Sequence, residues 1–204
     1  QMYGSNVFLD LKYHDIPETV KGAANAATQL GVYMFNVHAS GGIKMMEAAV
    51  EGAKESAEKY GVIVPKIVGV TILTSIDRNI MNKELRIEGS VEDHVRWLAY
   101  NSGMAELDGV VCSAADLNHI KKELSDDFIY VTPGVKGLND AVGSDQKRVF
   151  TPGNAIRDGS SILVIGRAIT DPRTKEQKDK NISVNLEMQL DAGYEILKDM
   201  AKHL

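Results

Sequence analysis

Residues 8–17 of this 204-residue chain read Phe-Leu-Asp-Leu-Lys-Tyr-His-Asp-Ile-Pro. The first half of this segment belongs to a short run, residues 7–12, that is rich in β-forming residues, and a helical pattern starts at Pro17. In a regular strand alternate side chains share a face, so Asp10 and Lys12 are expected to point the same way. Asp15 falls just beyond the strand, at the end where α/β folds build their active sites. The segment therefore predicts a parallel strand that carries charged side chains at its C-terminal end.

Two interpretations of this segment are open. A lysine held beside carboxylates keeps its proton and can act as a positioned acid or as an electrostatic clamp. Asp15 could instead cap the helix that follows, with Pro17 in its first turn and Glu18 completing a capping box. Because exposed ion pairs at strand ends are common, the segment alone does not decide between them.

Strand and helix patterns alternate along the rest of the chain. Strands are expected over residues 7–12, 32–38, 67–74, 110–113, 128–132 and 162–166. Helices are expected over residues 17–30, 43–60, 90–101, 115–124 and 151–159. Gly31, Gly61 and Gly103 are expected to end three of these helices, and Ser90 with Asp93 to cap one. The alternation implies right-handed βαβ crossovers and a mainly parallel sheet of six strands.

The C-terminal part of the chain differs in composition. Residues 173–181 are the least apolar stretch and are expected to form a surface loop. After them, apolar residues at helical spacing suggest a packed terminal helix; they are Leu186, Leu190, Leu197, Ala201 and Leu204. No long linker or compositional break divides the chain. Residues 1–204 are therefore expected to form one domain, in which residues 173–204 are a polar loop followed by a helix.

Composition excludes several classes of protein. The 23 basic and 28 acidic residues give a net charge of −5, which argues against a dedicated nucleic-acid binder. No stretch approaches 18 uninterrupted apolar residues, so no membrane-spanning helix is expected. The single cysteine, Cys112, rules out a disulfide framework within the chain and fits a reducing compartment as an inert, packed thiol. Clustered metal ligands, a Ser-His-Asp order, a P-loop and a dinucleotide fingerprint are all missing from the sequence.

Four further expected strand ends carry small or polar residues, at 38–42, 73–75, 132–136 and 165–167. Gly166 followed by Arg167 suits a phosphate, because backbone N–H groups and a guanidinium can hold its oxygens together. The loop 134–145, which leads to Gln146, could close over the same anion. His38 is either an acid–base group or, more often for a histidine at such a position, a residue that fixes its loop through hydrogen bonds. Their shared position at strand C-termini supports one common site.

Seven motifs that follow one another between about residues 4 and 172 are similar to those of one enzyme family. They are FLDLKYHDIP at 8–17, VHASGG at 37–42, VTILTS at 70–75, VTPGVK at 131–136, DQKR at 145–148, TP at 151–152 and VIGRAIT at 164–170. By these motifs the chain resembles the orotidine 5′-phosphate decarboxylase family in its bacterial branch. Related phosphosugar decarboxylases and aldolases share the DxKxxD element at 10–15. The elements at 15–19, 73–75 and 166–170 point to the orotidine branch.

The resemblance implies a TIM-type (β/α)₈ barrel, of which this chain holds strands 3–8, and a homodimer with shared active sites. It implies loss of CO₂ from orotidine 5′-phosphate to give UMP in cytoplasmic pyrimidine biosynthesis, without a cofactor or a metal. By this resemblance Lys12 would protonate C6 while Asp10 lies against the departing carboxylate and holds Lys12. Asp15, Ile16 and Thr19 would reach into the neighbouring subunit's site, where Asp15 completes the charge array.

The same resemblance places residues around the base and the phosphate. Thr74 with Ser75 would meet the pyrimidine edge. The phosphate side would be shaped and bound by Pro133, Lys136, Gln146, Gly166 and Arg167. The family usually has arginine where Lys136 stands, which weakens any planar, bidentate phosphate contact at this position.

The chain also departs from the family pattern before Asp10. The family has two βα units there, which supply a ribose-binding aspartate and a second active-site lysine, and nine residues cannot contain them. Because a barrel of about 250 residues averages roughly 30 per unit, about 50 residues are expected to be missing, and the chain alone is expected to be inactive. Two other hypotheses remain: a related phosphosugar decarboxylase or aldolase, and a non-catalytic phosphate-binding barrel.

Overall fold

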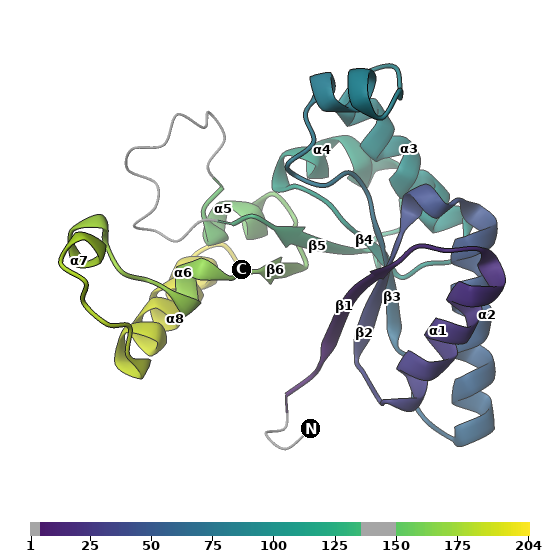
Figure 1. The fold of residues 1–204 in the computed structure, drawn as a ribbon, viewed down its shortest axis with the longest axis horizontal. Coiled ribbons are helices and arrows are strands. Elements are labelled where there is room, and N and C mark those ends of the chain that lie inside the picture. Colours follow the sequence, from purple (N-terminus) through teal and green to yellow (C-terminus); the bar gives the residue numbers. More distant parts are fainter. Residues whose placement is uncertain (1–4, 136–149) are drawn as a thin grey trace. The chain divides into compact units, whose positions relative to one another are not determined.

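The computed structural model describes residues 5–135 and 150–204, and the chain divides into two compact units (Figure 1). Unit 1 comprises Gln1–Cys112 and Asn118–Ile129. Unit 2 comprises Ser113–Leu117 and Tyr130–Leu204. Both units contain parallel strands followed by helices, as the alternating pattern of the sequence predicts.

Within its described residues, unit 1 has four parallel strands that neighbour one another in chain order. They are β1 (Phe8–Tyr13), β2 (Met34–His38), β3 (Lys66–Val70) and β4 (Gly109–Val111). The connecting helices are α1 (Pro17–Gln29), α2 (Ile43–Tyr60) and α3 (Val91–Met104), with shorter helical turns at Ala39–Gly41 and Ile80–Glu84. Parallel pairing puts all four strand C-termini at one edge of the sheet.

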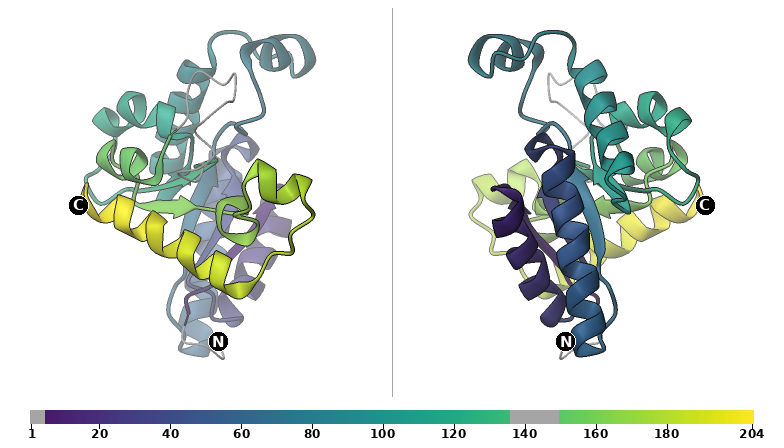
Figure 2. Two further views of the ribbon diagram at one scale, coloured as in Figure 1. Left: turned by 90° about the vertical axis from the view of Figure 1, so that its left-hand side faces the viewer. Right: turned by 90° about the vertical axis from the view of Figure 1, so that its right-hand side faces the viewer.

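The core of unit 1 packs β2 and β3 against α1 and α2. The two helices run side by side (Figure 2) because small residues line their contact. A side chain at Gly52 would clash with the backbone carbonyl of Lys21 on α1, so this position requires glycine. Ser56 donates a hydrogen bond of 3.0 Å to the carbonyl of Asn25 across the same contact. This close packing fixes β1 and β2 and the loops that follow them.

Unit 2 contains the parallel pair of β5 (Ile129–Pro133), from Tyr130 onward, and β6 (Ile162–Val164). The hydroxyl of Ser160 donates a hydrogen bond of 2.7 Å to the hydroxyl of Thr132, and both residues are buried. The helices of the unit, within its described residues, are α5 (Pro152–Arg157), α6 (Arg167–Thr170), α7 (Lys175–Asp179) and α8 (Leu186–Ala201).

Several sequence-based expectations are confirmed in detail. The helix predicted over residues 43–60 has those bounds, and Gly61 ends it in the left-handed conformation with φ +65°. Gly31 follows α1 with φ +69°. Thr151 caps α5, because its hydroxyl accepts a hydrogen bond of 3.2 Å from the N–H of Asn154.

Other expectations about local structure are wrong. The helix predicted over residues 115–124 is broken into the turn Ala114–Asp116, α4 (Leu117–Ile120) and the turn Lys121–Glu123, with Ser113 and Asp116 capping the first turn tightly. Gly103 does not end α3, which continues to Met104 before Glu106 turns with φ +59°. The loop predicted over residues 173–181 contains α7, which begins at a capping box that the polar composition obscured.

The terminal helix exists as α8, but the packing predicted for its leucines is wrong. Leu186, Leu190 and Leu197 are 69%, 64% and 63% exposed, whereas Ile196 is 4% exposed and buries its side chain. Helical periodicity identifies an apolar stripe, and it does not say which neighbouring element covers that stripe. The structure therefore identifies which face of α8 is buried, and the sequence pattern does not.

Candidate active site

An ion pair marks the end of β1. The Nζ atom of Lys12 donates a hydrogen bond of 2.6 Å to Oδ1 of Asp10, and the side chains are 37% and 51% exposed. Burial acts to raise the pKa of Asp10, but hydrogen bonds from Lys12 and Asn36 together with the Lys12 charge outweigh it, and the pKa is lowered. The carboxylate is therefore ionised at neutral pH and able to hold a protonated lysine in place.

The strand is irregular where this pair lies. Leu9 lies opposite Phe35, but Tyr13, four residues later on β1, pairs only two residues further along β2. Such a bulge changes the local backbone, and Lys12 takes φ +51°, which is uncommon for a residue with a side chain. Asp10 and Lys12 meet as predicted, but within a bulge and not through the regular alternation of a strand.

Asn36 belongs to this site and was missed at the level of the sequence. It lies in the middle of β2, is 1% exposed, and hydrogen-bonds both Asp10 and the backbone of Lys12. The available signal was a lone amide in the otherwise apolar run 34–37. A buried polar side chain needs hydrogen-bond partners, so an amide within this apolar run indicates that another segment of the chain supplies them.

Two histidines lie close to the pair. The rings of His14 and His38 have centroids 5.4 Å apart, with planes inclined at 43°. The pKa of His38 is lowered, first by burial and then by the nearby charges of His14 and Lys12. Within residues 5–135 and 150–204 no hydrogen bond from the His38 ring accompanies this contact, so packing on His14, and not the predicted hydrogen bonding, links His38 to the loop after β1.

Asp15, Ile16 and Thr19 lie at the start of α1, and all three are exposed. The N-cap of α1 is Ile16, which makes no side-chain capping bond, and the Asp15 carboxylate instead accepts a hydrogen bond of 2.6 Å from the N–H of Ile16. The capping box with Glu18 is therefore not formed. Asp15 keeps an accessible carboxylate just beyond the Asp10–Lys12 pair in sequence.

Thr74 and Ser75 lie in an exposed turn beyond β3, closed by a hydrogen bond of 2.9 Å from the N–H of Ile76 to the carbonyl of Leu73. The strand predicted over residues 67–74 stops at Val70, which leaves both hydroxyls outside the sheet. In the described parts of the chain, no hydrogen bond joins them to the Asp10–Lys12 pair. Thr74 and Ser75 share with that pair only the edge of the sheet at which the parallel strands end.

The residues expected at a phosphate lie in unit 2. Pro133 ends β5, and Gly166 with Arg167 begins α6 just after β6, both exposed. The carbonyl of Gly166 accepts hydrogen bonds from the N–H groups of Ile169 and Thr170, at 2.9 and 3.1 Å. Two further candidates, Lys136 and Gln146, lie outside the described residues.

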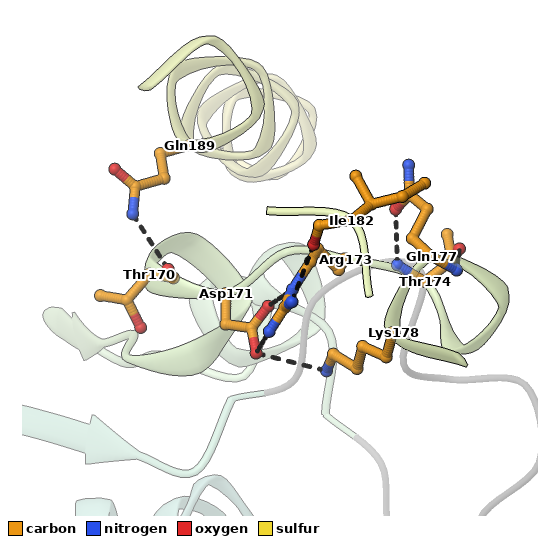
Figure 3. A network of polar contacts seen from close by, with 8 residues as sticks. All are labelled: Thr170, Asp171, Arg173, Thr174, Gln177, Lys178, Ile182 and Gln189. Atoms are coloured by element: carbon orange, nitrogen blue, oxygen red, sulfur yellow. Dashed lines mark hydrogen bonds and ion pairs between the residues drawn. The ribbon is translucent and has the colours of Figure 1, made fainter. Parts of the chain in front are cut away.

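A polar network holds the segment that follows α6 (Figure 3). Arg173 contacts both carboxylate oxygens of Asp171, at 2.6 and 3.0 Å, and donates a further bond of 2.9 Å to the carbonyl of Ile182. Gln189 of α8 donates a hydrogen bond of 2.9 Å to the carbonyl of Thr170. The bidentate hydrogen bond from Arg173 lowers the pKa of Asp171 to about 2. The turn that presents Arg167 is thus tied to α8.

Two features are absent from residues 5–135 and 150–204. No group of three or more His, Cys, Asp or Glu side chains is arranged to hold a metal ion there. No helix in these ranges combines the length and the apolar character needed to cross a bilayer.

The sequence and the fold both match known proteins. The sequence model of the orotidine 5′-phosphate decarboxylase / HUMPS family matches residues 1–182. The chain belongs to this family. Two relatives are each named orotidine 5′-phosphate decarboxylase: one from Moorella thermoacetica, 44% identical over 185 residues, and one from Lactobacillus delbrueckii subsp. bulgaricus, 41% identical over 200 residues.

The alignments cover most of this chain and about three quarters of each relative. They span 91% and 98% of this chain, and 73% and 77% of the two relatives. The crystal structure of orotidine 5′-phosphate decarboxylase from Lactobacillus acidophilus matches with a TM-score of 0.77 and 34% identity, over 97% of this chain and 76% of that chain. The predicted α/β-barrel fold class, of which this chain holds part, is thereby confirmed.

Proposed function

We propose that this protein decarboxylates orotidine 5′-phosphate to UMP in pyrimidine biosynthesis. The observation that carries the proposal is the 2.6 Å contact between Lys12 and Asp10 at the end of β1 in a member of this family. Relatives named for this reaction are 41–48% identical to the chain, which favours orotidine 5′-phosphate over the other substrates of the family.

In the proposed step, the bond between C6 and the carboxylate breaks and CO₂ leaves. The electron pair stays on C6 and takes a proton from the Nζ atom of Lys12, which solvent later reprotonates. The Asp10 carboxylate holds the Lys12 side chain in place through the 2.6 Å hydrogen bond. It also lies against the substrate carboxylate, which leaves as neutral CO₂. Lysine and aspartate suffice for these roles, so the proposal includes no cofactor.

The remaining candidates bind and orient the nucleotide. Thr74 and Ser75 take the pyrimidine edge. Gly166 and Arg167 bind the phosphate through backbone N–H groups and a guanidinium. Pro133, Lys136 and Gln146 complete the phosphate side. Binding energy at the phosphate serves the chemistry at C6, because a remote contact can be used to reach the transition state.

The proposed enzyme is a homodimer with shared sites. Asp15 and Thr19 are exposed, and the apolar side chain of Ile16 is 67% exposed, which suits a contact with a second subunit. In that arrangement Asp15 of one chain completes the charge array beside Lys12 of the other. The proposed setting is the cytoplasm, where a lone cysteine such as the buried Cys112 stays reduced.

Turnover by the protein expressed from its complete reading frame tests this function. We expect UMP to form from orotidine 5′-phosphate, measured by the absorbance change of the base, with no aldol or decarboxylation product from a hexulose phosphate. Turnover of the phosphosugar alone would favour the second enzyme of the family. Binding of UMP with no turnover of either compound would favour a non-catalytic phosphate-binding barrel.

A further inference from the structure

The amide of Asn36 makes two hydrogen bonds to β1, and both go to the ion pair. Its Nδ2 atom donates to Oδ1 of Asp10 at 2.6 Å. Its Oδ1 atom accepts from the backbone N–H of Lys12 at 2.7 Å. One buried side chain therefore contacts the carboxylate of the first residue and the main chain of the second.

The bond to Lys12 replaces a bond that the bulge removes. In a regular parallel ladder a backbone N–H of β1 would donate to a carbonyl of β2. Within the bulge Lys12 has left that ladder and has φ +51°, and its N–H donates to the Asn36 side chain instead. Asn36 therefore supports the unusual backbone conformation from which the Lys12 side chain extends.

The bond to Asp10 directs its carboxylate. Oδ1 of Asp10 receives the Lys12 ammonium and the Asn36 amide together, each at 2.6 Å. The Asn36 amide is a neutral donor, so it stabilises the ionised Asp10 carboxylate and does not take up the proton that Lys12 carries. This bond is one cause of the lowered pKa of Asp10.

We infer that Asn36 is a positioning residue for the proton transfer, holding the Asp10 carboxylate and the Lys12 backbone in the arrangement that brings the two side chains together. Its effect on turnover rests on the proposed function. An amide donates and accepts at once, whereas an aspartate of the same shape only accepts when ionised and a leucine, which has the same branching, does neither. Hydrogen-bonding capacity as well as side-chain shape therefore favours asparagine at position 36.

Two substitutions separate this role from packing. Asn36→Leu keeps the branched shape of the side chain and removes both hydrogen bonds. Asn36→Asp keeps an acceptor for the N–H of Lys12 and sets a second carboxyl against Asp10, so the two carboxyls should titrate as a coupled pair with one step raised towards neutral pH. Ser102→Ala is the matched control, because its buried hydroxyl donates to the carbonyl of Leu98 at 2.8 Å and contacts neither member of the pair.

For Asn36→Leu we expect kcat to fall about a hundredfold, the effect of moving a reacting group by roughly 1 Å, with KM nearly unchanged. The acidic limb of its pH–kcat profile should move to higher pH, because Asp10 loses a donor to its ionised form. The profile of Asn36→Asp should gain an ionisation near neutral pH that the unmodified protein lacks. Ser102→Ala should keep both the rate and the profile.

Unchanged kcat and pH profiles in Asn36→Leu and Asn36→Asp would overturn the inference, as would equal losses in Ser102→Ala. If Asn36→Leu does not fold, Asn36→Asp decides alone. Titration of the Asp10 carboxyl by ¹³C NMR tests the same point without turnover, because its pKa should rise in Asn36→Leu and it should titrate as one of a coupled pair in Asn36→Asp. An unmodified protein that makes no UMP would refute the proposed function, while a pKa of Asp10 that stays the same in both variants would refute the role of Asn36.

Discussion

The backbone N–H of Gly153 donates a hydrogen bond of 2.8 Å to Oδ2 of Asp199, 46 residues further along the chain. Gly153 is the second residue of α5, where a helix leaves N–H groups without an internal acceptor, and Asp199 lies near the end of α8. A Cβ on Gly153 would lie 2.8 Å from the same carboxylate oxygen, so the approach depends on glycine. The carboxylate thus anchors the terminal helix on α5.

Asp199→Ala should lower the free energy of unfolding by about 1.5–3 kcal/mol, because it removes a charge-assisted hydrogen bond and leaves a helix N–H unpaired. Urea unfolding measures the change. Glu195→Ala on the same helix is the control: its carboxylate pairs with Lys198 at 3.5 Å on the surface, and its loss should cost less than about 0.5 kcal/mol. Equal effects of the two substitutions would contradict the anchoring role.

Lys12→Ala should abolish UMP formation by the whole protein while leaving affinity for UMP largely intact, because Lys12 is the proposed proton donor and not the main binding group. A spectrophotometric assay measures turnover, and calorimetric titration with UMP measures binding. Lys44→Ala, an exposed lysine of α2, is the control and should keep both. Turnover near the normal rate in Lys12→Ala would remove Lys12 from the reaction.

Arg167→Ala should lower kcat/KM for the nucleotide by about 10- to 100-fold, which corresponds to about 1.5–3 kcal/mol for one charge-assisted phosphate contact. Arg157→Ala is the matched control, because Arg157 is exposed on α5 and pairs with Asp158 at 3.1 Å. Steady-state kinetics measure both. A fall of less than about threefold in Arg167→Ala, well under 1 kcal/mol, would show that Arg167 does not bind the phosphate.

Mixing two inactive variants tests the shared site. If Asp15 serves the neighbouring subunit and Lys12 its own, Lys12→Ala and Asp15→Ala homodimers should both be nearly inactive. After subunit exchange about half of the dimers are mixed, and each mixed dimer has one intact site. Activity should therefore recover to about one quarter of that of the unmodified protein, given symmetric pairing.

A role for Asp15 within its own chain gives the opposite result. Each chain would then carry a complete defect, and exchange could repair neither. Activity that stays at the level of the separate variants, with exchange shown by native mass spectrometry, would remove Asp15 from the shared site.

Asp171 should make part of the stability depend on pH. The pKa of Asp171 is about 2 in the folded chain against 3.8 as the ordinary value, because Arg173 bonds its ionised form. A lowered pKa contributes stability that is complete above about pH 4 and lost as the pH falls towards 2. The gap in urea midpoint between the unmodified protein and Asp171→Asn should shrink over that range. Asp191→Asn, exposed on α8, should show no such trend.

The order of strands and helices could be predicted from the sequence, because periodicity and stop residues are local signals. The bounds of α2 and its end at Gly61 are examples. The Asp10–Lys12 pair was predictable as well, since its members are only two positions apart in the chain. Interactions between residues close in the sequence were sufficient to predict these features.

Only the tertiary structure decided how the pair is held and which face of α8 is buried. The bonds from Asn36 cross 24 and 26 positions of the chain and depend on a bulge in β1 that regular alternation does not predict. Ile196 is buried while Leu190 is exposed, although both are equally apolar in a helical pattern. Contacts between distant segments follow from packing and strand register, and a local pattern contains neither.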